Sequence, residues 1–231
     1  MERTPLRDAF VKRDKRFLLL EKGLGLAAFS RDDALLEVGC AGGEAARHLT
    51  QAGYTALTAV DIDPAAVDRA RAACPGVDFV CADACDLPFA PMRFDGIISE
   101  ASFALIPDKA AAAREYARVL RPGGRVLLND FALKRDSTAT RRDIEGIPCL
   151  EGVQTAEKYI EIFQSAGFKT LLCDEEFPEL VRIAMSLSRE YAVPMREVGR
   201  YIQRAFGNDN YVNEFFEKSS MSYFRIIFEK E

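Results

Sequence analysis

Short apolar runs and longer amphipathic stretches alternate along the chain. Runs with the length and composition of β-strands predict strands at 34–38, 56–60, 77–81, 94–99, 124–130, 168–174 and 222–229. Apolar residues at helical spacing between them predict helices at 43–52, 64–73, 109–120 and 155–166. Strands that alternate with helices through right-handed crossovers form a parallel, doubly wound sheet, so we expect an α/β fold.

Two further stretches also read as helical. Residues 7–29 predict an amphipathic helix, and its expected core contacts are Phe10, Phe17, Leu18, Leu24 and Leu26. Residues 178–218 carry an apolar stripe at Leu180, Ile183, Ala184 and Leu187. The chain has 231 residues, the length of one domain with an accessory segment. We therefore treat 1–231 as a single domain, with 1–30 as an N-terminal helical cap and 178–218 as a helical insert or lid.

The first predicted strand runs directly into a glycine-rich turn. Residues 35–43 read LLEVGCAGG, and a predicted helix follows at once. Glycines lack a Cβ atom, so the backbone can turn sharply and lie against a ligand. In an open α/β sheet this turn sits at the carboxyl end of the first strand, where ligands bind. The pattern predicts a site for a nucleoside-type cofactor.

An acidic residue ends the second predicted strand. Asp61 can accept both hydroxyl protons of a ribose through its two carboxylate oxygens. The alternative for Asp61 is the N-cap of the next helix, but Asp63, directly before Pro64, fits the cap better. We assign Asp61 to ribose and Asp63 to the cap.

Four segments together resemble the class I S-adenosylmethionine (SAM)-dependent methyltransferases. The turn EVGCAGG is similar to the first motif of that family, and AVDIDP at 59–64 to its second strand with the terminal acid. CADACDLPF at 81–89 and RVLRPGGRV at 118–126 are similar to its segments after the third strand and before the fifth. Four motifs in the right order are a far more specific signal than any one of them. The resemblance covers roughly residues 30–175.

The resemblance implies a fold, a cofactor and a set of residues that bind it. It implies a Rossmann-like seven-stranded sheet of order 3-2-1-4-5-7-6, with the last strand antiparallel, and SAM as methyl donor with S-adenosylhomocysteine as product. The implied cofactor residues are Glu37, Gly39, Cys40, Ala41, Gly43, Asp61, Ile62, Asp83, Ala84 and Ser99.

Within that set, Asp83 would accept a hydrogen bond from the amine of adenine, and the amide of Ala84 would meet a ring nitrogen. The alternative for Asp83 is a turn aspartate that bonds its own backbone. Glu37 would hold the amino group of the methionine part, because a charge inside an apolar strand is costly unless it is paired. Ala41 stands where the family usually has glycine, and an alanine is tolerable there if its φ angle is negative.

The catalytic chemistry is less clear from the sequence. The methyl carbon of a sulfonium is already electrophilic, so positioning can do much of the work, and only poorly acidic nucleophiles need a general base. Glu100, after the fourth strand, is the candidate base, and Phe103 is a candidate wall of the substrate pocket. A surface glutamate and a core phenylalanine are the alternatives. The only histidine, His48, fits packing or surface exposure better than catalysis.

Two features bear on the acceptor. The insert contains large side chains that either line a substrate pocket or pack its helices on the sheet: Tyr191, Met195, Tyr201, Phe206, Tyr211, Phe215 and Phe216. The segment IPCLEG at 147–152 is similar to the cysteine loop of arsenite methyltransferases, in which thiolates bind trivalent arsenic. Cys149 and Cys173 would then be two ligands, but no convincing third thiol exists, so a structural cysteine is favoured.

Composition excludes several classes of function. A net charge of −5 and a pI near 5.2 argue against broad nucleic-acid binding. No apolar run approaches the ~20 residues that span a bilayer, and the start of the chain lacks a signal-peptide pattern. Six cysteines are scattered without metal-binding spacing, so we expect reduced thiols in the cytoplasm and no metal.

These observations predict a SAM-dependent methyltransferase that acts on a small-molecule acceptor, with a possible homodimer through the helical insert. A non-catalytic SAM-binding or scaffold protein is the first alternative. An NAD-dependent oxidoreductase is the second, but the turn fails its Gly-x-Gly-x-x-Gly fingerprint because Glu44 stands at the last glycine position.

Overall fold

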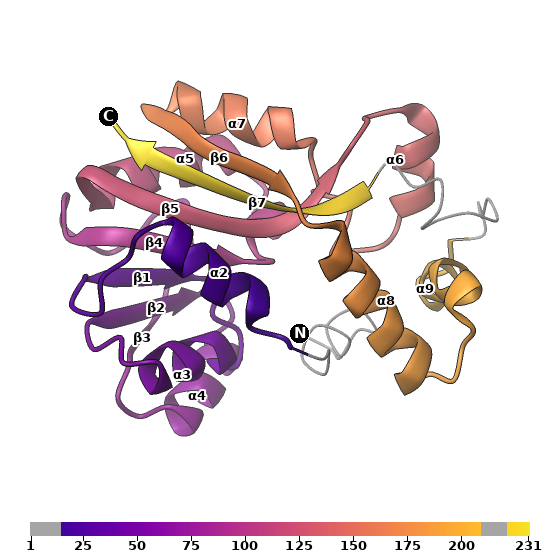
Figure 1. Cartoon of the computed structure of the whole chain (residues 1–231), viewed down its shortest axis with the longest axis horizontal. Coiled ribbons are helices and arrows are strands. Elements are labelled where there is room, and N and C mark those ends of the chain that lie inside the picture. Colours follow the sequence, from indigo (N-terminus) through magenta and orange to yellow (C-terminus); the bar gives the residue numbers. More distant parts are fainter. Residues whose placement is uncertain (1–14, 209–220) are drawn as a thin grey trace.

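The computed structural model describes residues 15–208 and 221–231, which contain one mixed sheet of seven strands (Figure 1). The strands are β1 (Leu35–Val38), β2 (Leu57–Asp61), β3 (Asp78–Cys81), β4 (Phe94–Glu100), β5 (Leu120–Leu133), β6 (Phe168–Glu175) and β7 (Met221–Lys230). Their order is β3-β2-β1-β4-β5-β7-β6, and β7 runs antiparallel to both of its neighbours. The predicted fold, including the antiparallel last strand, is confirmed.

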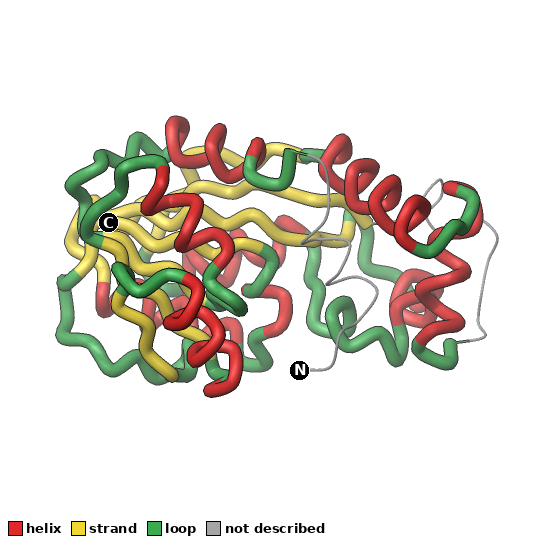
Figure 2. Tube along the Cα trace, turned by 90° about the horizontal axis from the view of Figure 1, so that it is seen from below, coloured by secondary structure: helices red, strands yellow, loops and turns green. Residues whose placement is uncertain are grey.

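Helices cover both faces of this sheet (Figures 1 and 2). One face packs under α2 (Leu18–Leu26), α3 (Glu44–Gln51) and α4 (Pro64–Ala73). The other packs under α5 (Lys109–Val119) and α7 (Ala156–Ser165). Three of these helices, α4, α5 and α7, begin where the sequence supplies a side chain that accepts from the first-turn amides. The N-caps of this kind are Asp63 for α4, Asp108 for α5 and Thr155 for α7.

A helical lobe lies beyond one end of the sheet, at the right of Figure 1. It consists of α6 (Thr138–Ile144), α8 (Phe177–Glu190), the short 3-10 helix η2 (Met195–Glu197) and α9 (Val198–Ala205). A second short 3-10 helix, η1 (Phe103–Leu105), follows β4. The lobe is therefore built from two segments, one between β5 and β6 and one between β6 and β7. The sequence predicted only the second, as the insert at 178–218.

The lobe has its own hydrophobic core, which we call the lobe core. It includes side chains of the long ends of β5 and β7 as well as those of the helices. Its members include Phe131, Leu133, Ile144, Ile147, Leu150, Leu180, Ile183, Leu187, Val198, Ile202 and Tyr223. Because strand and helix residues share this core, the lobe is packed onto the sheet and is not merely tethered to it.

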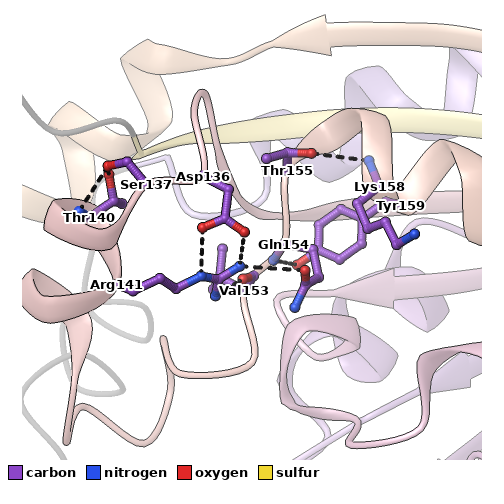
Figure 3. A network of polar contacts seen from close by, with 9 residues as sticks. All are labelled: Asp136, Ser137, Thr140, Arg141, Val153, Gln154, Thr155, Lys158 and Tyr159. Carbon is purple, nitrogen blue, oxygen red and sulfur yellow. Dashed lines mark hydrogen bonds and ion pairs between the residues drawn. The ribbon is translucent and has the colours of Figure 1, made fainter.

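A polar network ties α6 to the start of α7 (Figure 3). Arg141 donates to both carboxylate oxygens of Asp136, at 2.8 Å each, and to the carbonyl of Val153 at 2.7 Å. The amide of Gln154 donates to the hydroxyl of Tyr159 at 3.1 Å. These bonds satisfy the carbonyl of Val153 and the amide of Gln154, and the amide of Leu133 in β5 donates to the carbonyl of Gln154 at 2.9 Å, so the end of this segment is fixed to the sheet.

Two sequence predictions about element boundaries need correction. Within the described residues, the helix predicted at 7–29 is found as α2. Leu26 is 53% exposed, so its predicted core contact is wrong, whereas Leu24 is buried. Phe10 lies outside the described residues. The strand predicted at 124–130 extends to Leu133, since the lobe core buries the extra residues.

Candidate functional site

The glycine-rich turn after β1 is shaped mainly by contacts within the protein. Gly39 and Gly43 have φ angles of +81° and +77°, which favour glycine. A Cβ atom on Gly39 would clash with Ser102, and one on Gly43 would lie 3.0 Å from the Cβ of Ala70. The amides of Gly39 and Cys40 both donate to the carbonyl of Val60, at 2.8 and 3.0 Å. These glycines thus let the turn pack against its neighbours.

Ala41, within the same turn, has a φ angle of +49°. The negative φ angle that would make alanine comfortable at this position is therefore not found. A left-handed conformation costs an L-residue other than glycine about 1–2 kcal/mol. Backbone strain of this kind persists where the surroundings impose it, which occurs often at ligand sites.

Asp61, at the end of β2, is held in place by two backbone amides. Its Oδ2 accepts from Ala41 at 2.8 Å and its Oδ1 accepts from Asp63 at 3.0 Å. Each oxygen keeps a further lone pair, which is what a vicinal diol needs. Asp63 caps α4 through the amide of Ala65, as predicted.

The residues expected to contact adenine lie on the surface beside Asp61. Ile62 is 68% exposed, which is unusual for an isoleucine at a strand end. Asp83 accepts from the amide of Cys85 at 2.8 Å through Oδ1, so it does form the turn that we considered as its alternative role. The amide of Ala84 makes no hydrogen bond to the described residues.

Glu37 is buried inside β1 with a polar atom that has no partner. Its side chain is 2% exposed, and Oε2 makes no hydrogen bond. Burial raises the pKa of Glu37 to about 8, and the negative charges of Glu100, Glu44 and Asp61 add to this effect against the lowering effect of Arg16. Buried polar groups in proteins are normally bonded, so an orphan carboxyl oxygen points to a ligand group that donates.

Glu100, the candidate base, is half-buried at the end of β4. Its Oε2 accepts from Nδ2 of Asn129 at 2.8 Å, and its Oε1 accepts from the hydroxyl of Tyr223 at 3.4 Å. The Tyr223 hydroxyl also lies 3.1 Å from the carbonyl of Asn129. The sequence analysis missed both partners, although Asn129 and Asp130 form a polar pair that interrupts the apolar run of β5.

Other buried polar groups complete this end of the sheet. The hydroxyls of Ser99 and Ser102 lie 2.8 Å apart, and Ser102 donates to the carbonyl of Val38, so Ser99 is placed in the wall beneath the site. Asp130 accepts from the amides of Ala104 and Phe131, at 2.9 and 2.8 Å. Burial raises the pKa of Asp130 to about 7, against these two amide bonds.

The residues predicted to bind the acceptor lie in packed surroundings. Phe103 is fully buried against Tyr116 and Tyr159, which matches its alternative role as a core residue. Tyr191 packs on Tyr201 with ring centroids 4.8 Å apart, beside the lobe core. Tyr211, Phe215 and Phe216 lie outside the described residues, while Met195 is 41% exposed and Phe206 is half-buried.

The two cysteines of the arsenic hypothesis are both free thiols. Cys149 packs against the lobe core, and burial raises its pKa to about 12. Cys173 lies exposed on the edge strand β6. Within residues 15–208 and 221–231, no cluster of three or more His, Cys, Asp or Glu side chains is placed to hold a metal ion.

His48 stacks on Phe17 with ring centroids 4.1 Å apart, as expected for a packing histidine. Among the helices that the structure describes, none has the length and apolar character required to traverse a bilayer.

Comparison with known proteins gives matches to methyltransferases. Residues 36–128 match the family described as "Methyltransferase domain". The chain is 35% identical over 135 residues to 27-O-demethylrifamycin SV methyltransferase of Amycolatopsis mediterranei, covering 56% of this chain and 50% of that protein. It is 30% identical over 175 residues to phthiotriol/phenolphthiotriol dimycocerosates methyltransferase 1 of Mycobacterium ulcerans, covering 73% and 62%. The chain thus spans between half and two thirds of the length of these relatives.

Among solved structures, the chain resembles the [4+2]-cyclase SpnF, with a TM-score of 0.74 and 21% identity over 98% of this chain and 91% of that one. A likeness at this identity establishes the fold alone.

Proposed function

Because the chain belongs to the class I SAM-dependent methyltransferases, we propose that it transfers the methyl group of SAM to a hydroxyl oxygen of a small molecule, with S-adenosylhomocysteine as the product. The name of one relative, 27-O-demethylrifamycin SV methyltransferase, supports an oxygen as the acceptor atom. The observation that carries the proposal is the orphan carboxyl oxygen of Glu37, which lies buried one strand away from the pre-positioned carboxylate of Asp61.

The residues present fit the parts of SAM. Glu37 would receive the ammonium group, which supplies the donor that Oε2 lacks. Asp61 would hold the ribose diol through the free lone pairs of its two oxygens. Ile62 would cover one face of the adenine ring, and Asp83 with the Ala84 amide would bond its edge.

Methyl transfer needs a positioned acceptor and a place for its proton. When bound, the sulfonium supplies an electrophilic methyl carbon, so that an oxygen lone pair forms the new C–O bond while the C–S bonding pair stays on sulfur. We assign Glu100 as the group that accepts the hydroxyl proton, since it lies beside Glu37 and reaches the surface of the site. Asn129 and Tyr223 fix the orientation of its carboxylate.

The helical lobe would cover the acceptor. Cys149 and Tyr191, at the edge of the lobe core, stay predictions as substrate contacts, as does Phe103, whose buried ring would act only by shaping the site. A homodimer through the lobe and a cytoplasmic location also stay predictions.

The alternative is a protein that binds SAM without transferring its methyl group. Two observations favour it: the turn amides of Gly39 and Cys40 are used within the protein, and Ala41 adopts a left-handed conformation. The structural similarity to a cyclase also shows that proteins with this fold do not all catalyse methyl transfer. The NAD-dependent alternative has no support from the comparisons.

Calorimetric titration of the purified protein with SAM, S-adenosylhomocysteine and NAD tests the cofactor. Micromolar binding of both adenosyl ligands without binding of NAD is the expected result. Absence of binding by folded protein free of carried-over cofactor would overturn the proposal. Transfer of a labelled methyl group from SAM to hydroxylated acceptors would then separate an enzyme from a scaffold that only binds SAM.

A further inference from the structure

Four polar side chains lie directly opposite one another across four neighbouring strands. Glu100 of β4 is paired with Asn129 of β5, Asn129 with Arg225 of β7, and Arg225 with Asp174 of β6. We call this set the polar row. Residues directly opposite in a sheet project to the same face, so the four side chains form a line across β4, β5, β7 and β6, beginning at Glu100 beside the site.

Each residue of the polar row is bonded toward the nearer end of the row, but no hydrogen bond joins the two central side chains, Asn129 and Arg225. Asn129 donates to Glu100 at 2.8 Å, and Nη2 of Arg225 contacts Asp174 at 3.2 Å and Glu176 at 2.6 Å. In contrast, Oδ1 of Asn129 and both Nε and Nη1 of Arg225 are buried and have no hydrogen-bond partner among residues 15–208 and 221–231. Asn129 is fully buried and Arg225 is 4% exposed. An unfilled acceptor thus stands opposite two unfilled donors.

These unpartnered atoms are complementary to an oxygen that both donates and accepts. A hydroxyl group fits both sides, because it can donate to Oδ1 of Asn129 and accept from Arg225, and a carbonyl oxygen fits the arginine side alone. The charges of the row favour a neutral group over an anion. Arg225 is already balanced by Asp174 and Glu176, and Glu100 adds a further carboxylate. A carboxylate or phosphate on the ligand would therefore meet net negative surroundings.

We propose that Asn129 and Arg225 bind a second oxygen of the methyl acceptor, next to the hydroxyl group that faces Glu100. This inference rests on the proposed function and names its substrate class. The side chains of Glu100 and Asn129 are in direct contact at 2.8 Å, so groups bound beside each of them lie close together, and we place the two oxygens on adjacent or next-but-one carbons. The acceptors are neutral small molecules with this 1,2- or 1,3-dioxygenated pattern. Glu100 is half-buried, so the row opens to the surface at the end where the methyl group is transferred.

The test compares matched pairs of probes on the complex with S-adenosylhomocysteine: catechol against phenol, and 2′-hydroxyacetophenone against 2-ethylphenol, so that each pair differs only in the second oxygen. Binding is measured by calorimetry or ligand-observed NMR. We expect the dioxygenated member of at least one pair to bind at least tenfold more tightly. Arg225→Lys keeps the positive charge beside Asp174 and Glu176 but removes the Nε and Nη1 donors that would bind the ligand oxygen. We expect this variant to bind the two members of each pair about equally tightly, so that the ratio of their affinities is close to one, with an unchanged affinity for S-adenosylhomocysteine.

Arg125→Lys is the matched control. Arg125 lies on β5 at the far end of the same sheet face, bonded to Glu229 at 2.8 Å, and has no contact with the polar row. This variant should keep the wild-type ratio. A preserved ratio in Arg225→Lys, or equal binding within both pairs in the wild type, would overturn the inference. Failure of every dioxygenated probe to bind a protein that binds S-adenosylhomocysteine would overturn it too, whereas loss of cofactor binding would overturn the proposed function instead.

Discussion

The backbone amide of Ala41 donates a hydrogen bond to Asp61 across the ends of β1 and β2, with 2.8 Å between the nitrogen and Oδ2. With the amide of Asp63 on its other oxygen, the carboxylate is oriented before any ligand arrives. Pre-organisation of this kind lowers the cost of binding. We expect Asp61→Ala to weaken SAM binding at least tenfold, about 1.4 kcal/mol, in calorimetric titration.

Asp63→Ala provides the control two residues away. Asp63 caps α4 through the amide of Ala65, so its loss should lower the free energy of unfolding, measured in urea titrations. Its carboxylate is not assigned to the cofactor, and the affinity for SAM should stay at the wild-type value. Equal SAM affinity in Asp61→Ala and the wild type would contradict the ribose assignment.

Ala41→Gly tests whether the turn is strained. Glycine adopts a φ angle near +49° without a steric penalty, although it also adds entropy to the unfolded chain. We expect the relief of strain to dominate and to raise the free energy of unfolding by about 1 kcal/mol in urea titrations. A loss of stability would show that the alanine methyl group makes favourable contacts that outweigh its backbone conformation.

The pKa of Glu37 links SAM binding to pH. A pKa near 8 means that empty protein carries a proton on Glu37 at pH 7, whereas a bound ammonium group favours the carboxylate. Binding must then release a proton, so the association constant rises with pH up to about pH 8. Between pH 6 and pH 7 we expect an increase of up to about tenfold, measured by calorimetry in buffers of different ionisation enthalpy.

Two comparisons isolate this effect. Adenosine lacks the ammonium group, so its binding should show no such pH dependence, while S-adenosylhomocysteine should behave like SAM. Glu37→Gln removes the titrating group and should flatten the dependence for SAM and S-adenosylhomocysteine. A steep pH dependence that survives in Glu37→Gln would assign the proton to another residue.

The features predicted from the sequence are those that depend on local chemistry. The alternation of strands and helices was read from local patterns, while the order of the sheet was implied by the resemblance of four short motifs to a known family. Asp63 was assigned to the α4 cap from its place before Pro64. The burial of Glu37 followed from its position inside an apolar run. These patterns span few residues, so the sequence displays them directly.

The polar row could not be predicted in this way. Its members are contributed by β4, β5, β7 and β6, and only the register of these strands shows that Asn129 faces Arg225. A shift of one residue in that register would turn each side chain to the other face. The location of Phe103 in the core likewise depends on helices α5 and α7, which pack over it from elsewhere in the chain.

The lobe core predicts that the lobe and the sheet unfold together. Ile183 of α8 is buried in that core along with Phe131 and Tyr223 from the sheet. Removal of residues 178–218 would therefore uncover sheet residues instead of leaving the sheet intact. Ile183→Ala should lower the free energy of unfolding by about 2–5 kcal/mol in a single urea transition.

Met185 provides the control on the same helix. It is 47% exposed, so Met185→Ala should change the free energy of unfolding by no more than about 0.5 kcal/mol. Circular dichroism and the quenching of tyrosine fluorescence should report the same midpoint for each variant, because Tyr223 lies where the lobe meets the sheet. A separate early transition in Ile183→Ala would instead show that the lobe opens on its own, and the lobe would then be free to act as a lid over the acceptor.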